Sequence, residues 1–201
     1  MLEINQKNDI LIPFETIGSK GWQHNTLQIL AAYADNNNDD LPDIVAESDL
    51  ASLEKRLNTT IPKGLKLFYQ TFGLADIGEQ LQAFDDIDYL QNIWAENPEY
   101  APDFTDEDRK ILPDLISFSD YLGNGNMFCF HQHSHEIYYF DHDTSPLISK
   151  MFDRVDDYIK GCLIFAQGEL FGNAKPEQVE QWCEDIVIDL LGSQTVKKWR
   201  Y

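Results

Sequence analysis

The chain has 201 residues, of which 43% are hydrophobic and 12% aromatic, so it can bury a core and is neither disordered nor fibrous. Its 35 acidic and 15 basic residues give a formal net charge of −20. We therefore expect no direct binding to nucleic acid or to a membrane surface, since both attract cations. A basic partner, attracted over a long range, is favoured instead.

The cysteines and the N-terminus indicate the compartment. Cys129, Cys162 and Cys183 are an odd number without CxxC spacing, so they predict neither a disulfide framework nor a zinc ribbon. The first residues show no basic region followed by an apolar stretch, and no apolar run is long enough to cross a membrane. We expect a cytoplasmic protein with reduced thiols.

The first predicted element is a helix over residues 22–34, in which Leu27, Leu30 and Ala31 have helical spacing. The polar run at 36–40 predicts a loop. One short helix cannot hold a core of its own. We therefore interpret residues 1–40 as an N-terminal extension packed on a domain that spans residues 41–201.

Helices are predicted next between residues 48 and 94. Ser48 is the expected cap of the first, Pro62 suits the first turn of the second, which ends at Gly73, and a third follows Asp85. Thr105 and Asp108 resemble a capping box for one further turn. Each of the three helices has one apolar face, formed by Leu50, Leu53 and Leu57, by Leu65, Phe68 and Phe72, and by Ile87, Leu90 and Trp94.

Strands are predicted in the middle of the chain, and helices again after it. Residues 123–126 form a turn by composition, and a helix capped by Asp153 follows the strands. A terminal helix with Val179, Trp182, Ile186 and Leu190 ends at Gly192. This order predicts an α+β fold, a single domain with a mostly antiparallel sheet flanked by helices. The predicted strands cover residues 115–118, 127–130, 137–140 and 146–151.

Five strings carry a family resemblance: IPKGLKLFY at 61–69, LPDLISFS at 112–119, GNGNMFCF at 123–130, IYYFDHD at 137–143 and MFDRVDDYI at 151–159. In this order and at these separations they resemble the SUKH superfamily (SMI/KNR-like) of immunity and regulatory proteins. The resemblance covers residues 43–161. It departs at Phe72-Gly73-Leu74, where the family has Asn-Gly-Gly.

The resemblance implies a SUKH-like fold and a non-enzymatic function. Its members are typically antidotes that bind and block secreted bacterial toxins, often nucleases, and others are eukaryotic interaction modules. Our leading hypothesis is an immunity-type protein that neutralises a cognate, basic protein toxin by stoichiometric occlusion through an acidic surface. The alternative is a non-enzymatic regulatory scaffold of the same fold that binds an endogenous protein. The sequence does not indicate the oligomeric state.

The predicted partner-binding residues are acidic, because an acidic antidote gains association rate against a cationic toxin. Tyr89, Trp94 and Tyr100 are near them and are candidate anchors, although the helical spacing of Trp94 also fits core packing. A solvated face without a partner is the alternative for such charge runs. The eight residues are Asp85, Asp86, Asp88, Asp106, Glu107, Asp108, Asp141 and Asp143.

The histidines are the remaining chemical candidates. His131, His133, His135 and His142, with Asp141 and Asp143, are metal-capable, but the first three fall where a hairpin turns. We therefore expect no metal site and no cofactor. A hydrolase that uses the Asp141-His142-Asp143 string would need a nucleophile, and the chain has no GxSxG elbow. Cys129 and Cys162 are expected in the core. No residue is predicted to be catalytic.

Overall fold

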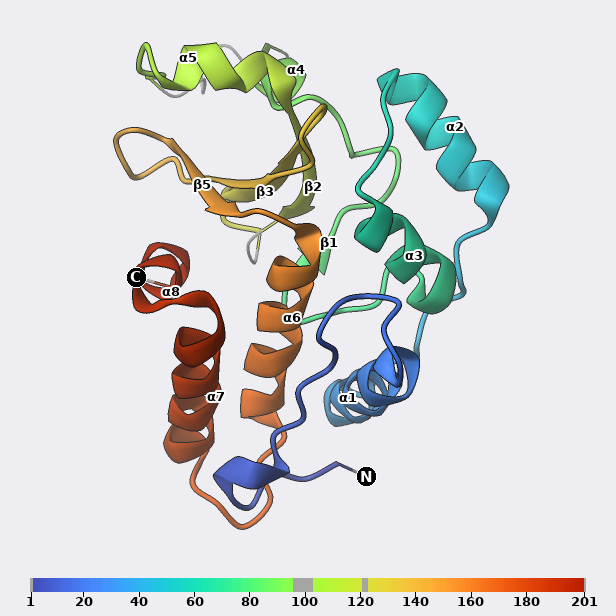
Figure 1. The fold of residues 1–201 in the computed structure, drawn as a ribbon, viewed down its shortest axis with the longest axis vertical. Coiled ribbons are helices and arrows are strands. Elements are labelled where there is room, and N and C mark those ends of the chain that lie inside the picture. The colour runs from blue at the N-terminus through green and yellow to red at the C-terminus, as the bar shows by residue number, and fades with distance from the viewer. Residues whose placement is uncertain (1, 96–102, 121–122, 201) are drawn as a thin grey trace. The chain divides into compact units, whose positions relative to one another are not determined.

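The structure is a computed structural model that describes residues 2–95, 103–120 and 123–200 (Figure 1). The chain forms two compact units, each assembled from separate stretches. The predicted N-terminal extension, residues 1–40, falls in unit 1 with the C-terminal helices, and its boundary at residue 40 stays a prediction. Unit 1 is Met1–Ile44, Leu67–Gly78 and Asp156–Tyr201, and unit 2 is Val45–Lys66 and Glu79–Val155.

Unit 2 is built on a five-stranded antiparallel sheet whose strand order follows the chain, β1-β2-β3-β4-β5. From β2 to β5 the consecutive strands are joined by short turns, as the sequence predicted, whereas the connection from β1 to β2 is long and carries short helices. The α+β fold class is therefore confirmed. The strands are β1 (Gln80–Leu81), β2 (Leu115–Asp120), β3 (Met127–His131), β4 (Ile137–Phe140) and β5 (Ile148–Phe152).

Short helices cover one face of this sheet, namely α4 (Leu90–Ala95), α5 (Asp108–Ile111) and η2 (Leu112–Asp114) (Figure 1). The rings of Trp94 and Phe104 pack on Phe140 of β4, with centroids 5.4 and 6.1 Å away. Because side chains alternate along a strand, the other face carries a second set of aromatic rings. These are Phe118, Phe128, Phe130 and Tyr139, all buried.

Helix α2 (Glu47–Leu57) also belongs to unit 2 and buries its predicted apolar face of Leu50, Leu53 and Leu57. Its N-cap is Ala46, so the expectation that Ser48 caps this helix is wrong. The helix ends at Asn58, whose φ of 53° is left-handed and closes the last turn. The connection to α3 (Lys63–Phe72) is then short.

Unit 1 is helical and contains α1 (Trp22–Asn37), most of α3, α6 (Val155–Ala166), η3 (Gln167–Glu169), α7 (Pro176–Leu191) and α8 (Ser193–Arg200). Trp22 of α1 meets Phe72 of α3 edge-on, with ring centroids 5.4 Å apart. One core cluster joins the N-terminal segment to α1, α6, α7 and α8. Its buried members are Ile4, Ile10, Ala32, Ile164, Leu170, Val179, Cys183, Val187 and Val196.

The N-terminal segment, which includes η1 (Lys7–Asp9), is tied to the C-terminal part of the chain. Ile4 N–H donates to the Leu170 carbonyl at 2.7 Å, and the Ile4 carbonyl accepts from Gly172 N–H at 3.1 Å. The buried Gln167 amide both accepts from Leu11 N–H and donates to the Leu11 carbonyl. Residues far apart in sequence therefore share one core.

In two helices of unit 1 the buried face agrees with the predicted one only in part, since Leu30 and Val179 are buried as expected and other predicted residues are not. In α1, Leu27 is 46% exposed and Ala31 is exposed, whereas Trp22, Thr26, Ile29 and Leu30 are buried. In α7 the buried stripe is Val179, Cys183 and Val187, and Leu190 is 46% exposed. Strand β1 and helix α8 were not predicted at all.

Candidate partner-binding surface

Two turns meet at one end of the sheet in unit 2. Gly123 and Gly125, both with positive φ, carry the chain from β2 into β3 and leave Asn126 buried. The Asn126 amide donates to the Tyr139 hydroxyl at 3.1 Å, and its Oδ1 accepts from the backbone N–H of His142 at 3.1 Å. The β2–β3 turn and the β4–β5 turn are thus held together by one buried side chain.

The same amide orients the His142 ring. Asn126 Oδ1 lies 2.6 Å from His142 Nδ1, so Nδ1 must carry the proton and donate it. The lone pair of the neutral ring is then on Nε2, 3.5 Å from Asp143 Oδ2. One ligand atom each from Asp141, His142 and Asp143 lies within 4.8 Å of the others, so these residues are able to contact a divalent cation. Three ligands at an exposed turn are fewer than a closed zinc site has.

Asp108 attaches α5 to the β4–β5 turn. Its carboxylate accepts hydrogen bonds from Thr105 N–H at 2.9 Å, from the Thr105 hydroxyl at 2.7 Å, from Leu147 N–H at 3.3 Å and from Ile148 N–H at 2.9 Å. Asp108 N–H donates back to Thr105 Oγ1 at 3.2 Å. The predicted capping box is therefore present, and it extends to a neighbouring strand.

Asp108 consequently does not lie on the surface where we expected it. It is 1% exposed, and its carboxylate is engaged inside the unit. Burial raises the pKa of Asp108, but the hydrogen bonds from Thr105, Ile148 and Leu147 outweigh it and lower that pKa overall. This correction removes Asp108 from the candidate contact residues and makes it a positioning residue.

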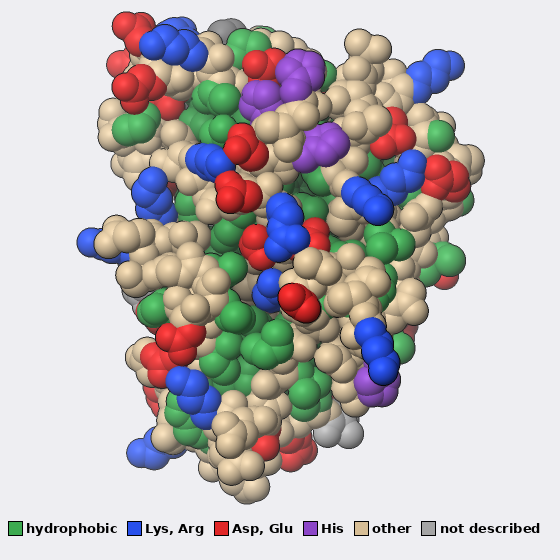
Figure 2. Space-filling model, in the orientation of Figure 1, with side chains coloured by type: hydrophobic (Ala, Val, Ile, Leu, Met, Phe, Trp, Pro, Cys, Tyr) green, Lys and Arg blue, Asp and Glu red, His purple; other side chains and the backbone are tan. Residues whose placement is uncertain are grey.

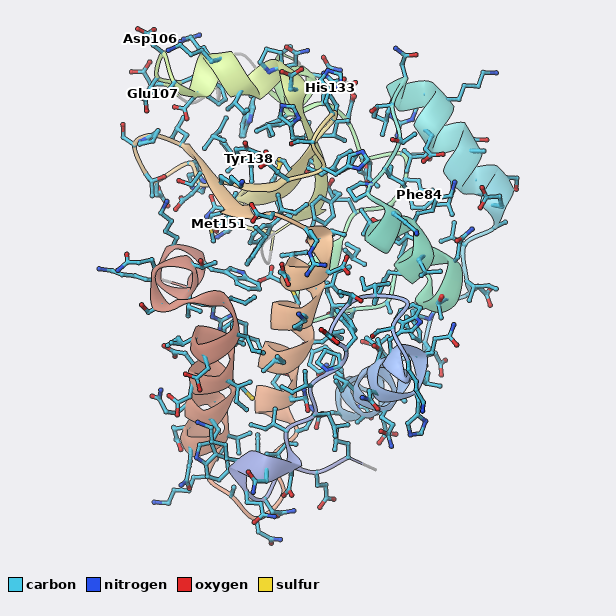
Figure 3. The ribbon with its side chains drawn as sticks, in the orientation of Figure 1. Phe84, Asp106, Glu107, His133, Tyr138 and Met151 are labelled. Atoms are coloured by element: carbon cyan, nitrogen blue, oxygen red, sulfur yellow. The ribbon has the colours of Figure 1, made fainter. Side chains whose placement is uncertain are left out.

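The acids next to Asp108 remain accessible. Asp106 and Glu107 are exposed at the start of α5 (Figure 3), and across the β4–β5 turn Asp143 is exposed and Asp141 half-buried. Leu147 connects the two sides, because its N–H donates to Asp108 and its carbonyl accepts from Asp141 N–H. We call Asp106, Glu107, Asp141 and Asp143 the turn surface.

The other predicted acids lie elsewhere in unit 2. Asp85 and Asp86 are exposed in a turn, and Arg56 fixes this turn by donating to the carbonyls of Phe84 and Ile87. Asp88 Oδ1 accepts from Tyr89 N–H and from Asn92 Nδ2, and the Asp88 carbonyl bonds to Ser117 of β2. Asp85, Asp86 and Asp88 therefore belong to the segment beside β2 and form a group separate from the turn surface at the start of α5 and the β4–β5 turn.

The three hairpin histidines, His131, His133 and His135, have different surroundings. His131 Nδ1 accepts from the backbone N–H groups of His133 and Ser134, both at 3.2 Å, and so closes the β3–β4 turn. His135 Nε2 bonds to the Thr60 carbonyl at 3.0 Å. His133 is exposed at the tip (Figure 3). Among the described residues, the metal-capable group of three is the one that contains His142, at the other end of β4.

A hydrogen-bond network behind this hairpin was missed by the sequence reasoning. Gln132 donates its side-chain amide to Asp114 Oδ1, and its Oε1 accepts from the Tyr89 hydroxyl at 2.9 Å. The same hydroxyl lies 2.9 Å from the Leu57 carbonyl at the end of α2. Thr59 Oγ1 donates to the Gln132 carbonyl at 2.9 Å. No local sequence pattern predicts this network, because its members are far apart in the sequence.

The candidate aromatic anchors and the cysteines have mainly internal contacts. Trp94 is half-buried against Phe140, Tyr89 is half-buried in the network just described, and Tyr100 lies outside the described residues. Burial raises the pKa of the Cys129 thiol, and burial followed by Glu180 raises that of Cys183 to about 12. All three cysteines are buried, which fits core packing.

Comparison with known families now identifies the chain. The model of the SMI1 / KNR4 family (SUKH-1) matches residues 44–161, more than half of the chain and nearly the same span as the resemblance described above, residues 43–161. The chain belongs to the SMI1/KNR4 family. This family includes immunity-type proteins and is generally non-enzymatic. No curated protein matches the chain. Within the described residues, none of the helices is long and apolar enough to cross a membrane.

The family strings have structural roles in unit 2. The GNGN string supplies Asn126, and the IYYFDHD string supplies Tyr139 and His142, so the two meet in the hydrogen bonds described above. The LPDLISFS string forms η2 and β2. The family pattern therefore fixes the turns on which the turn surface stands.

Proposed function

We propose that this SMI1/KNR4-family protein is a non-enzymatic immunity protein that neutralises a basic toxin by covering it in a 1:1 complex, with the turn surface as the contact. The observation that carries the proposal is the turn surface itself, in which acids from two segments stand on backbone that the buried Asp108 ties together. Charges that stand on a fixed backbone lose less entropy on binding than charges on a flexible loop, so they favour a tight complex.

The charge of the chain supports a basic partner. A net charge of −20 accelerates encounter with a cationic surface, and nucleases are cationic where they hold nucleic acid. The acids are not confined to the turn surface, because Figure 2 shows Asp and Glu side chains over elements of both units. The overall charge would attract the partner, and the turn surface would give the local fit.

Co-expression with the toxin candidates encoded beside this gene tests the proposal. We expect the chain to rescue growth from one of them and to form a 1:1 complex whose affinity falls with salt. If no neighbour is toxic, or if none is rescued, the immunity role is wrong. Capture of an endogenous protein without rescue would favour the regulatory scaffold instead.

The contact surface is tested with charge-neutralising variants of the same complex. The triple change Asp106→Asn, Glu107→Gln and Asp143→Asn should weaken toxin binding by about tenfold or more. A matched control, Asp35→Asn with Glu177→Gln and Asp189→Asn, removes the same charge from exposed residues of unit 1. Equal losses of toxin affinity in the two variants would mean that net charge alone, and not the turn surface, explains the weaker binding. If Asp85→Asn with Asp86→Asn loses more toxin affinity than the triple variant, the contact surface is the acidic group beside β2 instead.

A further inference from the structure

Unit 1 contains a small hollow at the C-terminal end of α1. It has a volume of about 30 Å³ and is bounded by the last turns of α1, by the segment that follows this helix and by Asp76. The wall combines apolar surface with carboxylates, and none of its residues is Lys, Arg or His. The lining residues are Leu30, Tyr33, Ala34, Asn37, Asp39, Asp40, Leu41, Pro42 and Asp76.

The backbone around the hollow is fixed. Asn38 ends α1 in the left-handed region with φ of 57°, and Asp39 N–H then donates to the Ala34 carbonyl at 2.8 Å. Further along, the Asp43 carbonyl lies against Gly73, where a Cβ atom would be only 2.1 Å away. Asp76 is held by Gly78 N–H, which donates to its Oδ1 at 2.7 Å. The backbone that frames the hollow is therefore preformed.

The electrostatic environment of the hollow is negative. Burial raises the pKa of the Tyr33 hydroxyl to about 12, and Asp76 and Glu169 add to this effect. Burial also raises the pKa of Glu169, and Asp76 is the next cause. The Glu169 shift shows that Glu169 and Asp76 repel one another, and the Tyr33 shift shows that the same two carboxylates disfavour a further negative charge, so a cation placed here would be favoured.

The size and the walls select among cations. A single water-sized group needs roughly 10–15 Å³ of such space, so about 30 Å³ suits a compact head better than a larger, planar guanidinium. An ammonium has the compact head and three donors for carboxylate oxygens. Leu30, Ala34 and Pro42 offer an apolar wall against which a chain of methylene groups can lie.

We propose that this hollow accepts the side-chain ammonium of a lysine on a protein partner, with Asp39, Asp40 and Asp76 as its counter-charges. The inference rests on the proposed function in one respect, that the partner is a basic protein. It adds a specific anchor in unit 1 for that partner. It also selects lysine over arginine at this position.

The test uses the full-length, isotope-labelled protein and a tripeptide probe, acetyl-Ala-Lys-Ala-amide, followed by NMR. We expect saturable shifts of the backbone amides of Asp39, Asp40 and Asp76, with binding in the millimolar range. Arginine and acetyl-lysine tripeptides should bind at least about fivefold more weakly. No saturable shift, or equal binding of the three probes, would overturn the inference.

Variants locate the site. Asp76→Asn keeps an oxygen for Gly78 N–H but removes the charge, so it should weaken the lysine probe about fivefold. The pair Asp39→Asn and Asp40→Asn should do the same from the other wall. Asp35→Asn removes an exposed α1 charge that does not line the hollow, and binding should be retained. Weakening by Asp35→Asn equal to that by Asp76→Asn would mean non-specific attraction and would overturn the site.

The two proposals fail separately. If the lysine tripeptide binds the hollow but no toxin is neutralised, the proposed function is wrong and the ammonium site stands. If a toxin is neutralised and Asp76→Asn leaves its affinity unchanged, the function stands and the lysine anchor is wrong. A parallel loss of tripeptide and toxin affinity in Asp76→Asn is the result that supports the anchor.

Discussion

Asp108 is the residue on which the geometry of the turn surface depends. Replacing it by Ala leaves the N–H groups of Leu147 and Ile148 without their acceptor, in a buried place. We expect Asp108→Ala to lower the free energy of unfolding by about 3 kcal/mol, because buried donors that lose a charged acceptor are costly. Urea unfolding measures this loss, and the exposed Asp106→Ala should change the same quantity by less than about 0.5 kcal/mol.

The Asp108 contribution also has a defined pH dependence. Its folded-state pKa is lowered from the ordinary value of 3.8, so the stabilisation is fully present above that value and is lost as the pH falls through the lower, folded-state pKa. The difference between the natural protein and Asp108→Ala should therefore stay constant from pH 7 to pH 5 and shrink below 3.8. A difference that already shrinks between pH 7 and pH 5 would contradict this explanation.

Tyr89 and Gln132 are expected to act together. The Tyr89 hydroxyl joins Gln132 of the hairpin to the Leu57 carbonyl of α2, so Tyr89→Phe should cost about 1 kcal/mol of unfolding free energy. Gln132→Ala should cost a similar amount or more. Because the two residues share a hydrogen bond, the double variant should lose at least about 0.5 kcal/mol less than the sum. Additive losses, measured by urea unfolding, would mean that this bond contributes nothing.

The sequence strings identified the turns of the site but not the contacts between them. GNGN and DHD each have the composition of a turn, and turns can be predicted locally. The contact of Asn126 with His142 spans two strands, so neither string contains it. Asp108 shows the same limit. Its capping box was predicted, but its burial depends on β5, which lies far away in sequence.

At the level of elements, the junction after α3 gives the sharpest test. Gly73 has φ of +65°, and a Cβ atom added to it would lie 2.1 Å from the carbonyl oxygen of Asp43. Gly73→Ala therefore combines backbone strain with a clash against main chain that cannot rotate away. We expect it to lower the unfolding free energy by about 3 kcal/mol or more.

Gly21 provides the matched control for Gly73. It has φ of +82°, and an added Cβ would meet nothing within 4 Å. Gly21→Ala should therefore show the backbone strain alone, about 1 kcal/mol. Both variants are measured by the same thermal or urea unfolding experiment. Equal losses at the two positions would show that the segment around Asp43 moves away without cost.

The buried face was predicted correctly for an element with a single apolar stripe and only in part for one with two stripes, and an element without a stripe was not predicted. In α2 the stripe of Leu50, Leu53 and Leu57 has no competitor, so its buried face is evident. In α7 both Trp182 with Ile186 and Cys183 with Val187 have helical spacing, and both pairs contact the core of unit 1, with the second pair fully buried and the first partly buried. Strand β1 has two residues, too few to show alternation.

The sequence did not predict helix α8 or the full buried face of α1, for related reasons. Helix α8 has only Val196 and Trp199 as buried residues, and the rest of it is polar. In α1 the buried face includes a threonine, Thr26, while Leu27 faces solvent. Hydrophobic spacing cannot select a face when a polar residue is buried and a leucine is not. Partners distant in sequence decide both cases.

At the scale of the whole molecule, the negative charge is shared by both units. Of the 35 acidic residues, 16 fall in unit 1 and 19 in unit 2, each in excess over the basic residues of its unit. The expected gathering of acids on one surface therefore applies only locally, at the turn surface. The remaining charge opposes folding within each unit by repulsion among like charges, and dissolved salt screens such repulsion.

Salt should consequently stabilise this protein. With a net charge of −20, raising NaCl from 20 to 300 mM should increase the midpoint of thermal unfolding by about 3–6 °C.

A variant with Asp39, Asp40, Asp85 and Asp86 each changed to Asn removes two exposed carboxylates from each unit. It should melt higher at low salt and gain less from NaCl. If the variant gains as much as the natural protein, the salt effect does not come from charge repulsion. A midpoint that falls with NaCl would instead mean that attractive ion pairs, such as Lys150 with Asp153, outweigh the excess negative charge.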